Sequence, residues 1–446
     1  MSAPSLHAVA MAQAAAAART GERIRDLYSR VRKFTEDLCA PLKTEDFVIQ
    51  TMADVSPTKW HLAHTSWFFE TFVLKQAVPH YRAFEEQYGY LFNSYYHAAG
   101  ERHPQTQRGL LSRPTVDEVF EYRHHVDRWV TRFLEESSDA ELGEIRFALE
   151  LGLNHEEQHQ ELLLTDIKHV LATNPLDPVY RPAIQSQPGT KAQPGWVGFD
   201  GGVVECGYRG AGFAFDNELP RHRVHLEAFD LANQPVSCGE YLEFIDDRGY
   251  ERPELWLSDG WDARQRQGWH APLYWKQTEN GWTLMTLSGR RRLDLSEPVC
   301  HVSYYEADAF ARWAGARLPR EEEWELAAAG QRIRGNFAES GRLHPSAVHS
   351  SASDGPRQMF GDTWEWTMSA YLPYPGYTPF AGAFGEYNGK FMSNRMVLRG
   401  GSCVTPIRHI RPTYRNFFAP DARWQFSGIR LARFGKASST ILRSDR

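Results

Sequence analysis

The spacing of apolar residues changes near residue 175, and this change limits the folds that the chain can adopt. Before it, apolar residues recur every three or four positions, which is the spacing of helices that bury one face. Four long segments show this pattern: residues 21–39, 56–76, 115–136 and 141–172. The connection after the second segment is the longest of the three. Together these features predict a four-helix bundle.

The remainder of the chain has a different pattern. Residues 176–195 are rich in Pro, Gly and Gln without a period, which indicates a linker. Short β-type runs follow at 201–208, 222–232, 298–303, 396–402 and 426–433, and helical patterns interrupt them at 237–247, 304–316 and 318–328. We therefore predict an α+β protein of two domains, with a helical bundle at 21–175, a second domain at 196–436, and flexible tails at 1–20 and 437–446.

Composition excludes several classes of function. The net charge of −6 offers no basic surface for nucleic acid or anionic lipid. No stretch approaches the roughly 20 apolar residues that span a bilayer, and the N-terminus lacks the basic start of a signal peptide. The five cysteines are widely spaced and form no CxxC, which favours reduced thiols. We expect a cytoplasmic protein without nucleic-acid or membrane partners, and we predict no oligomeric state.

Histidines on two of the expected helices suggest a metal site. In "NHEEQHQELLL" (154–164), His155 and His159 are four positions apart, so both lie on one helix face about 6 Å apart. "WHLAH" places His61 and His64 on a second, aromatic helix, where an unpaired imidazole is costly. The neighbouring Glu and Gln side chains are candidate acceptors that would fix the imidazole tautomers. The alternative is a solvated polar stripe, and the spacing alone does not choose between zinc and iron.

Two sets of motifs resemble known families. "WHLAHTSWFFE" and "NHEEQHQE" resemble the DinB-like helical domain of the sulfoxide synthases of ergothioneine biosynthesis. "RLPREEEWELAA" (317–328), "GDTWEWTMSAY" (361–371), "LRGGS" (398–402) and "FSGIRLAR" (426–433) resemble the formylglycine-generating-enzyme fold, a C-type-lectin-like relative also named sulfatase-modifying factor. Each fold alone hosts several activities, whereas their fusion with the histidines retained is specific.

The resemblance implies a non-heme iron enzyme. The Fe(II) ligands of the family fall on His64, His155 and His159, and His61 is the weaker candidate. The implied reaction joins imidazole C2 of hercynine to the sulfur of L-cysteine with O2, and gives hercynylcysteine sulfoxide. Iron would orient the two substrates and lower the pKa of the thiol.

The resemblance also implies substrate contacts. By its position, Gln158 would hold the hercynine imidazole, and Asn416 would contact its betaine end. A trimethylammonium group needs aromatic faces or oxygen dipoles, which Phe417, Phe418 and Trp424 could supply, with packing in the core as the alternative for Trp424.

The long connection of the bundle holds further candidates. A Tyr-Tyr pair in this connection lies at the iron in one branch of the family. Tyr95 or Tyr96 is therefore the expected proton donor, and the sequence does not choose between them. Arg102 and Arg108 are candidates to clamp a substrate carboxylate, and a surface position is the alternative for each.

Some alternatives concern the thiol and the reaction class. Members that use γ-glutamylcysteine have an Asp soon after the residue matching Asn416, but here Phe417-Phe418 follows, which favours free cysteine. An ovothiol-type synthase acting on histidine and a non-catalytic DinB-like metal-binding module remain the other readings. Formylglycine-generating chemistry needs a cysteine pair after "RGGS", whereas only Cys403 is present, as a small buried residue. Arg320 and Glu323 are expected to form a structural polar pair.

Overall fold

The computed structural model describes residues 24–184, 193–348 and 355–435. The two expected tails lie outside these ranges, as does part of the expected linker. Among the described residues, no helix is both long and apolar enough to cross a membrane.

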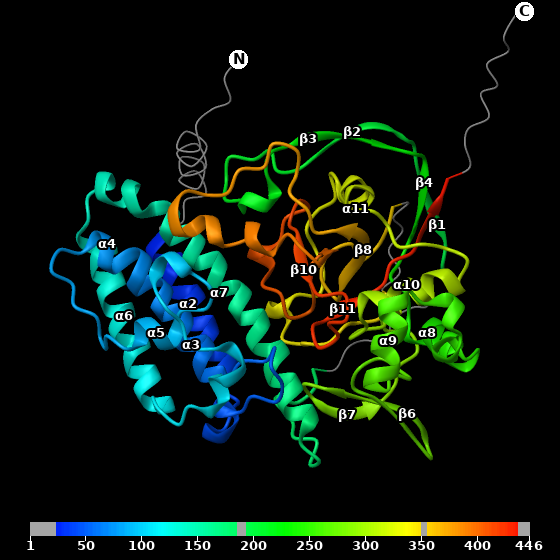
Figure 1. Ribbon diagram of the computed structural model, residues 1–446, viewed down its shortest axis with the longest axis horizontal. Coiled ribbons are helices and arrows are strands. Elements are labelled where there is room, and N and C mark those ends of the chain that lie inside the picture. The colour runs from blue at the N-terminus through cyan, green and yellow to red at the C-terminus, as the bar shows by residue number, and fades with distance from the viewer. Residues whose placement is uncertain (1–23, 185–192, 349–354, 436–446) are drawn as a thin grey trace, which may run out of the picture.

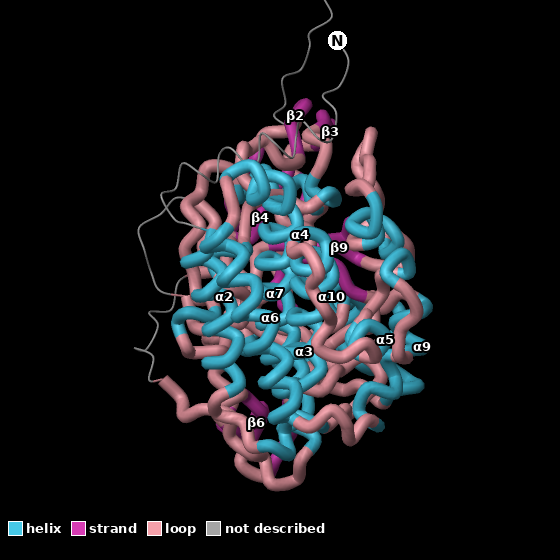
Figure 2. The backbone as a smooth tube through the Cα atoms, turned by 90° about the vertical axis from the view of Figure 1, so that its left-hand side faces the viewer, coloured by secondary structure: helices cyan, strands magenta, loops and turns pink. Residues whose placement is uncertain are grey.

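The four expected helices form the first part of the fold. They are α2 (Ile24–Cys39), α3 (Thr58–Phe69), α6 (Val116–Glu136) and α7 (Asp139–Thr173), and they lie alongside one another in Figure 2. The side chains of Thr115 and Ser138 cap α6 and α7, and each is paired with a glutamate three residues later in a capping box. A π-helical turn (Glu70–Leu74) and α4 (Lys75–Ala77) extend α3.

The long connection between α4 and α6 reaches the second half of the chain. It contains α5 (Tyr88–Phe92), followed by the 3-10 turns His97–Ala99 and Gln105–Leu110. The Glu386 carboxylate accepts hydrogen bonds from the backbone N–H groups of His97 (3.0 Å) and Ala98 (2.8 Å). Lys390 donates to the carbonyl oxygen of Tyr95. These contacts fix the Tyr-Tyr pair against the second domain.

The second half is α+β, as expected. Its helices are α8 (Cys238–Asp246), α9 (Ser258–Gln267), α10 (Tyr304–Trp313) and α11 (Glu321–Ala328). Its strands are β1 (Trp196–Phe199), β2 (Gly202–Cys206), β3 (His222–Leu226), β4 (Phe229–Ala232), β5 (Trp275–Thr278), β6 (Gly281–Thr286), β7 (Gly289–Arg292), β8 (Trp364–Ala370), β9 (Met396–Arg399), β10 (Asn416–Phe418), β11 (Ser427–Gly428) and β12 (Ala432–Phe434). They form small sheets in the orders β1-β4-β12, β10-β9-β8-β11, β2-β3 and β5-β6-β7.

Two expectations for this half are wrong. Residues 298–303 form no strand, because this stretch bonds to separate segments, including the carbonyls of Val236 and Ser427, and has only an isolated bridge at Pro298. The carboxylate of Glu323 pairs with Arg317 at 2.7 Å, and Arg320 contributes only its backbone N–H. Arg320 is the N-cap residue of α11, and its side chain is 40% exposed and pairs with Glu322 at 3.3 Å.

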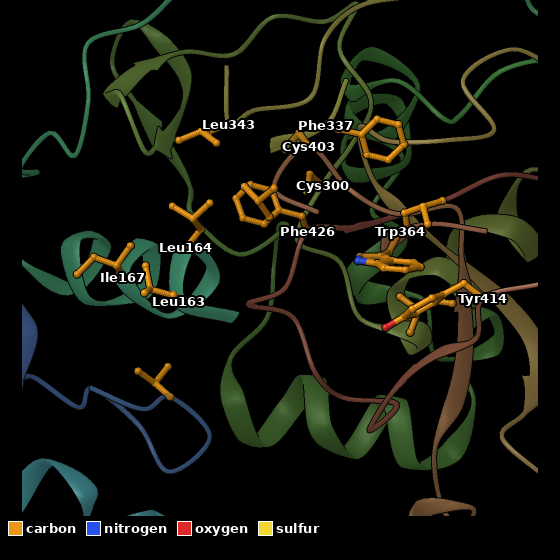
Figure 3. Close-up of a cluster of buried hydrophobic side chains, with 14 of the residues drawn as sticks. Leu163, Leu164, Ile167, Cys300, Phe337, Leu343, Trp364, Cys403, Tyr414 and Phe426 are labelled. Atoms are coloured by element: carbon orange, nitrogen blue, oxygen red, sulfur yellow. The ribbon is translucent and has the colours of Figure 1, made fainter. Parts of the chain in front are cut away.

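Helix α7 joins the two halves of the molecule. In Figure 1 it runs between the blue helices and the sheet-containing half. Figure 3 shows Leu163, Leu164 and Ile167 of this helix in the same buried cluster as Trp364 and Phe426. Cys403 is buried, as expected, and the other four cysteines are buried as well. Because the hydrophobic core is continuous across α7, side chains from both halves meet at this helix.

Candidate metal centre and substrate pocket

Three histidines from two helices converge on one point. His64 on α3 and His155 and His159 on α7 each offer a ring nitrogen, and these atoms all lie within 4.8 Å of one another. The ring centroids are 4.5 to 4.8 Å apart, and the Nε2 atoms of His64 and His155 are separated by 3.1 Å. All three side chains are buried. Four-residue spacing on α7 and the α3–α7 contact produce this cluster.

The ring of His64 is fixed on both faces and at one edge. Trp60 stacks on one side at 4.5 Å and Trp67 stacks at 5.5 Å, each within 14° of parallel. The Nδ1 atom bonds to the carbonyl oxygen of Phe92 at 2.6 Å, which requires a proton on Nδ1. The lone pair of Nε2 therefore points at the other two histidines.

The two histidines of α7 differ in their surroundings. His155 packs on Phe68 with ring centroids 4.8 Å apart, and its Nδ1 is buried without a hydrogen-bond partner. The Nδ1 atom of His159 lies 2.9 Å from Nδ1 of His61. His61 is thus outside the three-histidine cluster and supports it.

The electrostatics suit a metal ion. Burial lowers the pKa of all three imidazoles, that of His155 to about 3, so each is neutral near pH 7. Neutral imidazole is the form that binds transition metals. Three buried neutral nitrogen donors at this separation fit a divalent ion with further coordination positions open. The Nδ1 atom of His155, the other nitrogen of one of these rings, has no hydrogen-bond partner.

The expected role of the flanking glutamates is wrong. Glu156 accepts hydrogen bonds from Arg32 (2.8 Å), Arg123 (2.6 Å) and Thr35 (2.6 Å) on the far side of the helix. Burial opposes its ionisation, but the two arginines lower its pKa to about 2. Glu157 pairs with Arg408. Neither glutamate contacts an imidazole of the cluster, because successive helix positions face different directions.

A pocket opens beside His155 and His159. Its walls include five of the residues singled out by sequence: Tyr95, Gln158, Asn416, Phe417 and Phe418. Residues from α7 form one side, and β10 with the loop around Tyr387 forms the other. The structure therefore brings both groups of motifs to one cavity.

The remaining sequence candidates lie outside the pocket wall. Tyr96 is fully buried behind Tyr95, with ring centroids 4.6 Å apart. Trp424 donates to Asp166 at 3.2 Å. Arg102 is exposed and donates to the carbonyl of Ser94 at 2.7 Å.

Arg108 is buried near the cluster without lining the pocket. Its guanidinium lies 3.3 Å from the ring centroid of Trp60 and donates to the hydroxyl of Ser56 at 2.9 Å. In this arrangement it braces Trp60, which in turn stacks on His64.

A chain of hydrogen bonds that the sequence did not reveal runs through Gln158. Tyr387 donates to its Oε1, and its Nε2 donates to Tyr414 Oη at 2.7 Å. Tyr414 lies 2.8 Å from Nε2 of His409. Tyr414 could have been noticed two residues before Asn416, whereas nothing in the local sequence marks Tyr387.

Two buried amide oxygens in the pocket wall also escaped prediction. The Nδ2 of Asn217 donates to Tyr371 Oη and to the carbonyl of Arg415, which leaves Oδ1 without a partner. The Nε2 of Gln425 donates to a backbone carbonyl, and its Oε1 is likewise unpartnered. Since carbonyls accept only, neither amide can be flipped, so both free oxygens are acceptors. Their position in the pocket wall makes both oxygens candidate acceptors for a ligand.

Comparison with known proteins defines the class. Residues 27–163 match the DinB superfamily, and residues 181–354 and 334–434 match the sulfatase-modifying factor enzyme 1-like domain. The chain is 34% identical over 313 residues to the hercynine oxygenase of Mycobacterium tuberculosis, covering 64% of this chain and 71% of that protein. Identity to the hercynine oxygenase of Mycolicibacterium smegmatis is 34% over 311 residues, with the same coverage. The ergothioneine biosynthesis protein 1 of Schizosaccharomyces pombe is 28% identical over 236 residues, which are 50% of this chain and 28% of that protein. The chain belongs to the hercynine oxygenase family.

Proposed function

We propose that this protein is an iron(II)- and O2-dependent sulfoxide synthase that joins hercynine C2 to the sulfur of L-cysteine. The observation that carries the proposal is the buried cluster of His64, His155 and His159 at the wall of a pocket built by both halves of the chain. Family membership supports the reaction class. We assign the metal ligands to a domain at 21–175, and most of the substrate wall to a domain at 196–436, joined by the linker 176–195.

The three histidines would hold the iron. Bound there, iron(II) would supply electrons for O2 reduction and would lower the pKa of the substrate thiol. The residues around it define the site before substrate enters: Trp60 and Trp67 fix one imidazole plane, and the continuous core excludes water from the back of the cluster.

Hercynine would lie along α7. Gln158 would bond to its imidazole by exchanging one of its present partners, the hydroxyls of Tyr387 and Tyr414. Its trimethylammonium group would meet the aromatic faces of Phe417 and Phe418 together with the side chain of Asn416. The unpartnered oxygens of Asn217 and Gln425 would accept from, or lie against, the cationic groups of the two substrates.

Tyr95 is the better-placed proton donor of the tyrosine pair. It lines the pocket, whereas Tyr96 packs behind it. Burial raises the pKa of the Tyr95 phenol, so it keeps its proton at neutral pH. Its backbone is held by Lys390 of the second domain, which fixes the hydroxyl relative to the histidine cluster. A proton delivered by Tyr95 would favour C–S bond formation over plain oxidation of the thiol.

The proposed thiol rests on the absence of an acid directly after Asn416, where the next acidic residue is Asp421. Phe417 and Phe418 occupy the positions where a carboxylate would contact a γ-glutamyl group, and an apolar ring gives such a group no partner. We therefore propose free cysteine as the substrate. Arg102 or Arg108 would clamp its carboxylate only by giving up the contacts with Ser94, Ser56 and Trp60.

Oxygen uptake by the iron-loaded protein tests the proposal. The protein is given O2 with hercynine plus cysteine, hercynine plus γ-glutamylcysteine, or histidine plus cysteine, and products are identified by mass spectrometry. We expect the first pair to give the fastest uptake and hercynylcysteine sulfoxide. Turnover of histidine with cysteine alone would instead favour an ovothiol-type enzyme. Absence of uptake with every pair would favour a metal-binding module.

A further inference from the structure

We infer that Asp166 and His61 form a positioning relay that fixes the tautomer of the metal ligand His159, and that Trp424 of the second domain holds this relay in place. The inference rests on the proposed metal site. None of the three residues is needed as a ligand, and all lie within hydrogen-bond distance of one another or of the cluster.

The direction of each hydrogen bond in this relay follows from the Asp166 carboxylate at its outer end. An ionised carboxylate accepts only, so the contact of 3.1 Å between Asp166 Oδ2 and His61 Nε2 requires a proton on that Nε2. In a neutral imidazole the other nitrogen, Nδ1, then accepts. Its partner at 2.9 Å is Nδ1 of His159, which must therefore carry the proton. The lone pair of His159 is left on Nε2, the atom free to bind the metal.

Asp166 is itself held by three donors. The backbone N–H of Ser56 bonds to Oδ2 at 2.8 Å, in addition to His61. The indole N–H of Trp424 bonds to Oδ1 at 3.2 Å. Asp166 and His61 are both buried, so water does not compete for these bonds. Because Trp424 comes from the second domain, docking of that domain contributes to the geometry of a ligand carried by the first.

The arrangement differs for each of the three ligands. His64 receives its orientation from the carbonyl of Phe92, and His155 has no partner on Nδ1. Only His159 is oriented through a carboxylate and an intervening imidazole. Outer partners of this kind typically change metal affinity by about 10- to 100-fold when removed.

Cobalt(II) titration of purified variants tests the relay without turnover, because the visible absorption of the bound ion reports both affinity and ligand field. We expect His61→Leu to weaken cobalt binding by about 10- to 100-fold and to change the spectrum. His61→Gln, whose amide oxygen can accept from His159, should recover most of the affinity. Trp424→Phe should have a smaller effect of the same sign.

The control is His169→Leu, a histidine on the same helix that bonds to Thr51 away from the cluster, and it should bind cobalt like the original protein. Wild-type affinity in His61→Leu would overturn the relay. Failure of the unaltered protein to bind cobalt would instead contradict the proposed metal site.

A second measurement needs no variant. Nitrogen-15 NMR of histidine-labelled, zinc-loaded protein reports which nitrogen of each ring is protonated. The relay predicts metal on Nε2 and a proton on Nδ1 of His159. Zinc bound through Nδ1 of His159 would contradict it.

Discussion

At the scale of single residues, some side chains of the site face the pocket or the histidine cluster with one atom and are held by a hydrogen bond at another. His64, for example, can offer Nε2 to a metal because its Nδ1–H donates a hydrogen bond to the carbonyl of Phe92. The same holds for Gln158, whose two amide atoms are already occupied by tyrosines from the opposite wall. A substrate that bonds to Gln158, as we propose, would have to displace one of these tyrosines.

The tyrosine pair gives a residue-scale prediction. Tyr95→Phe removes the only hydroxyl of the pair that lines the pocket. The fraction of cysteine converted to its sulfinic acid should therefore rise, and the sulfoxide yield should fall by about 10²- to 10⁴-fold, the size of a lost general acid. Tyr96→Phe removes a buried hydroxyl that does not line the pocket and should leave the product ratio near that of the original enzyme. Mass spectrometry of both products gives the ratio. The reverse pattern would assign proton transfer to Tyr96.

Sequence reasoning reached the histidine cluster but not its supports. The i, i+4 spacing on one helix places His155 and His159 together without any tertiary information. Their partners could not be found this way, because the bonds of His61 to His159 and of Tyr387 to Gln158 join positions about 100 and 230 residues apart. The glutamates beside the cluster were expected to orient the imidazoles, but the carbonyl of Phe92 and the ring of His61 do so instead.

At the scale of elements, helix α7 contributes to the histidine cluster, the hydrophobic core and the contact between the two halves. One face of the helix carries two of the proposed metal ligands and Gln158, and its apolar face enters the core in Figure 3. Its last turns contact the second half, where Lys168 bonds to His301. A close approach to α3 is possible because Gly152 has no side chain: a Cβ there would lie 2.7 Å from Phe69 and 2.9 Å from Phe68.

Two glycines of α7 give a matched pair of variants. Gly152→Ala should lower the free energy of unfolding by about 1–3 kcal/mol, because the rings of Phe68 and Phe69 must move. Gly143→Ala on the same helix meets open space and should raise it by about 0.5–1 kcal/mol through helix propensity. Urea denaturation checks both. Equal effects of the two substitutions would show that α3 and α7 are not in close contact.

Lys168 near the end of α7 makes stability depend on pH. Its Nζ lies 2.6 Å from Nε2 of His301 in the second domain, and burial lowers its pKa to about 8. The unfolded chain, with an ordinary lysine pKa near 10.5, binds more protons between pH 8 and 10.5. Stability contributed at this position should therefore rise with pH across that window and stay constant below it.

Comparison with Lys168→Met isolates this effect. The urea midpoint of the original protein should rise relative to that of the variant between pH 8 and 10.5. Parallel curves for the two proteins would contradict the lowered pKa.

The prediction of strands failed at the hairpins of the second half and at one extended segment. The hairpins β5-β6-β7 were missed although Asn280-Gly281 and Ser288-Gly289 mark both turns, with φ of 98° and 91° at the glycines. Residues 298–303 were taken for a strand because of their apolar composition, which also suits an extended segment bonded to unrelated neighbours. The amphipathic helices were predicted well, since their period is local.

At the scale of the whole molecule, the pocket beside the histidines is formed where the two halves meet. One half holds the histidines, and the other supplies Tyr387, Tyr414, Asn416 and the acceptor Asn217. Each half alone resembles proteins with other activities. The pocket, and with it the proposed specificity, exists only where they join along α7.

Metal content and coordination test the central claim most directly. Anaerobic loading of the full-length protein with iron(II), followed by metal analysis and X-ray absorption spectroscopy, should give one iron per chain with imidazole nitrogen ligands. His155→Leu and His159→Leu should each abolish stoichiometric binding, whereas His169→Leu should retain it. A protein that binds no iron, or that binds it equally well without His155 and His159, would contradict the account.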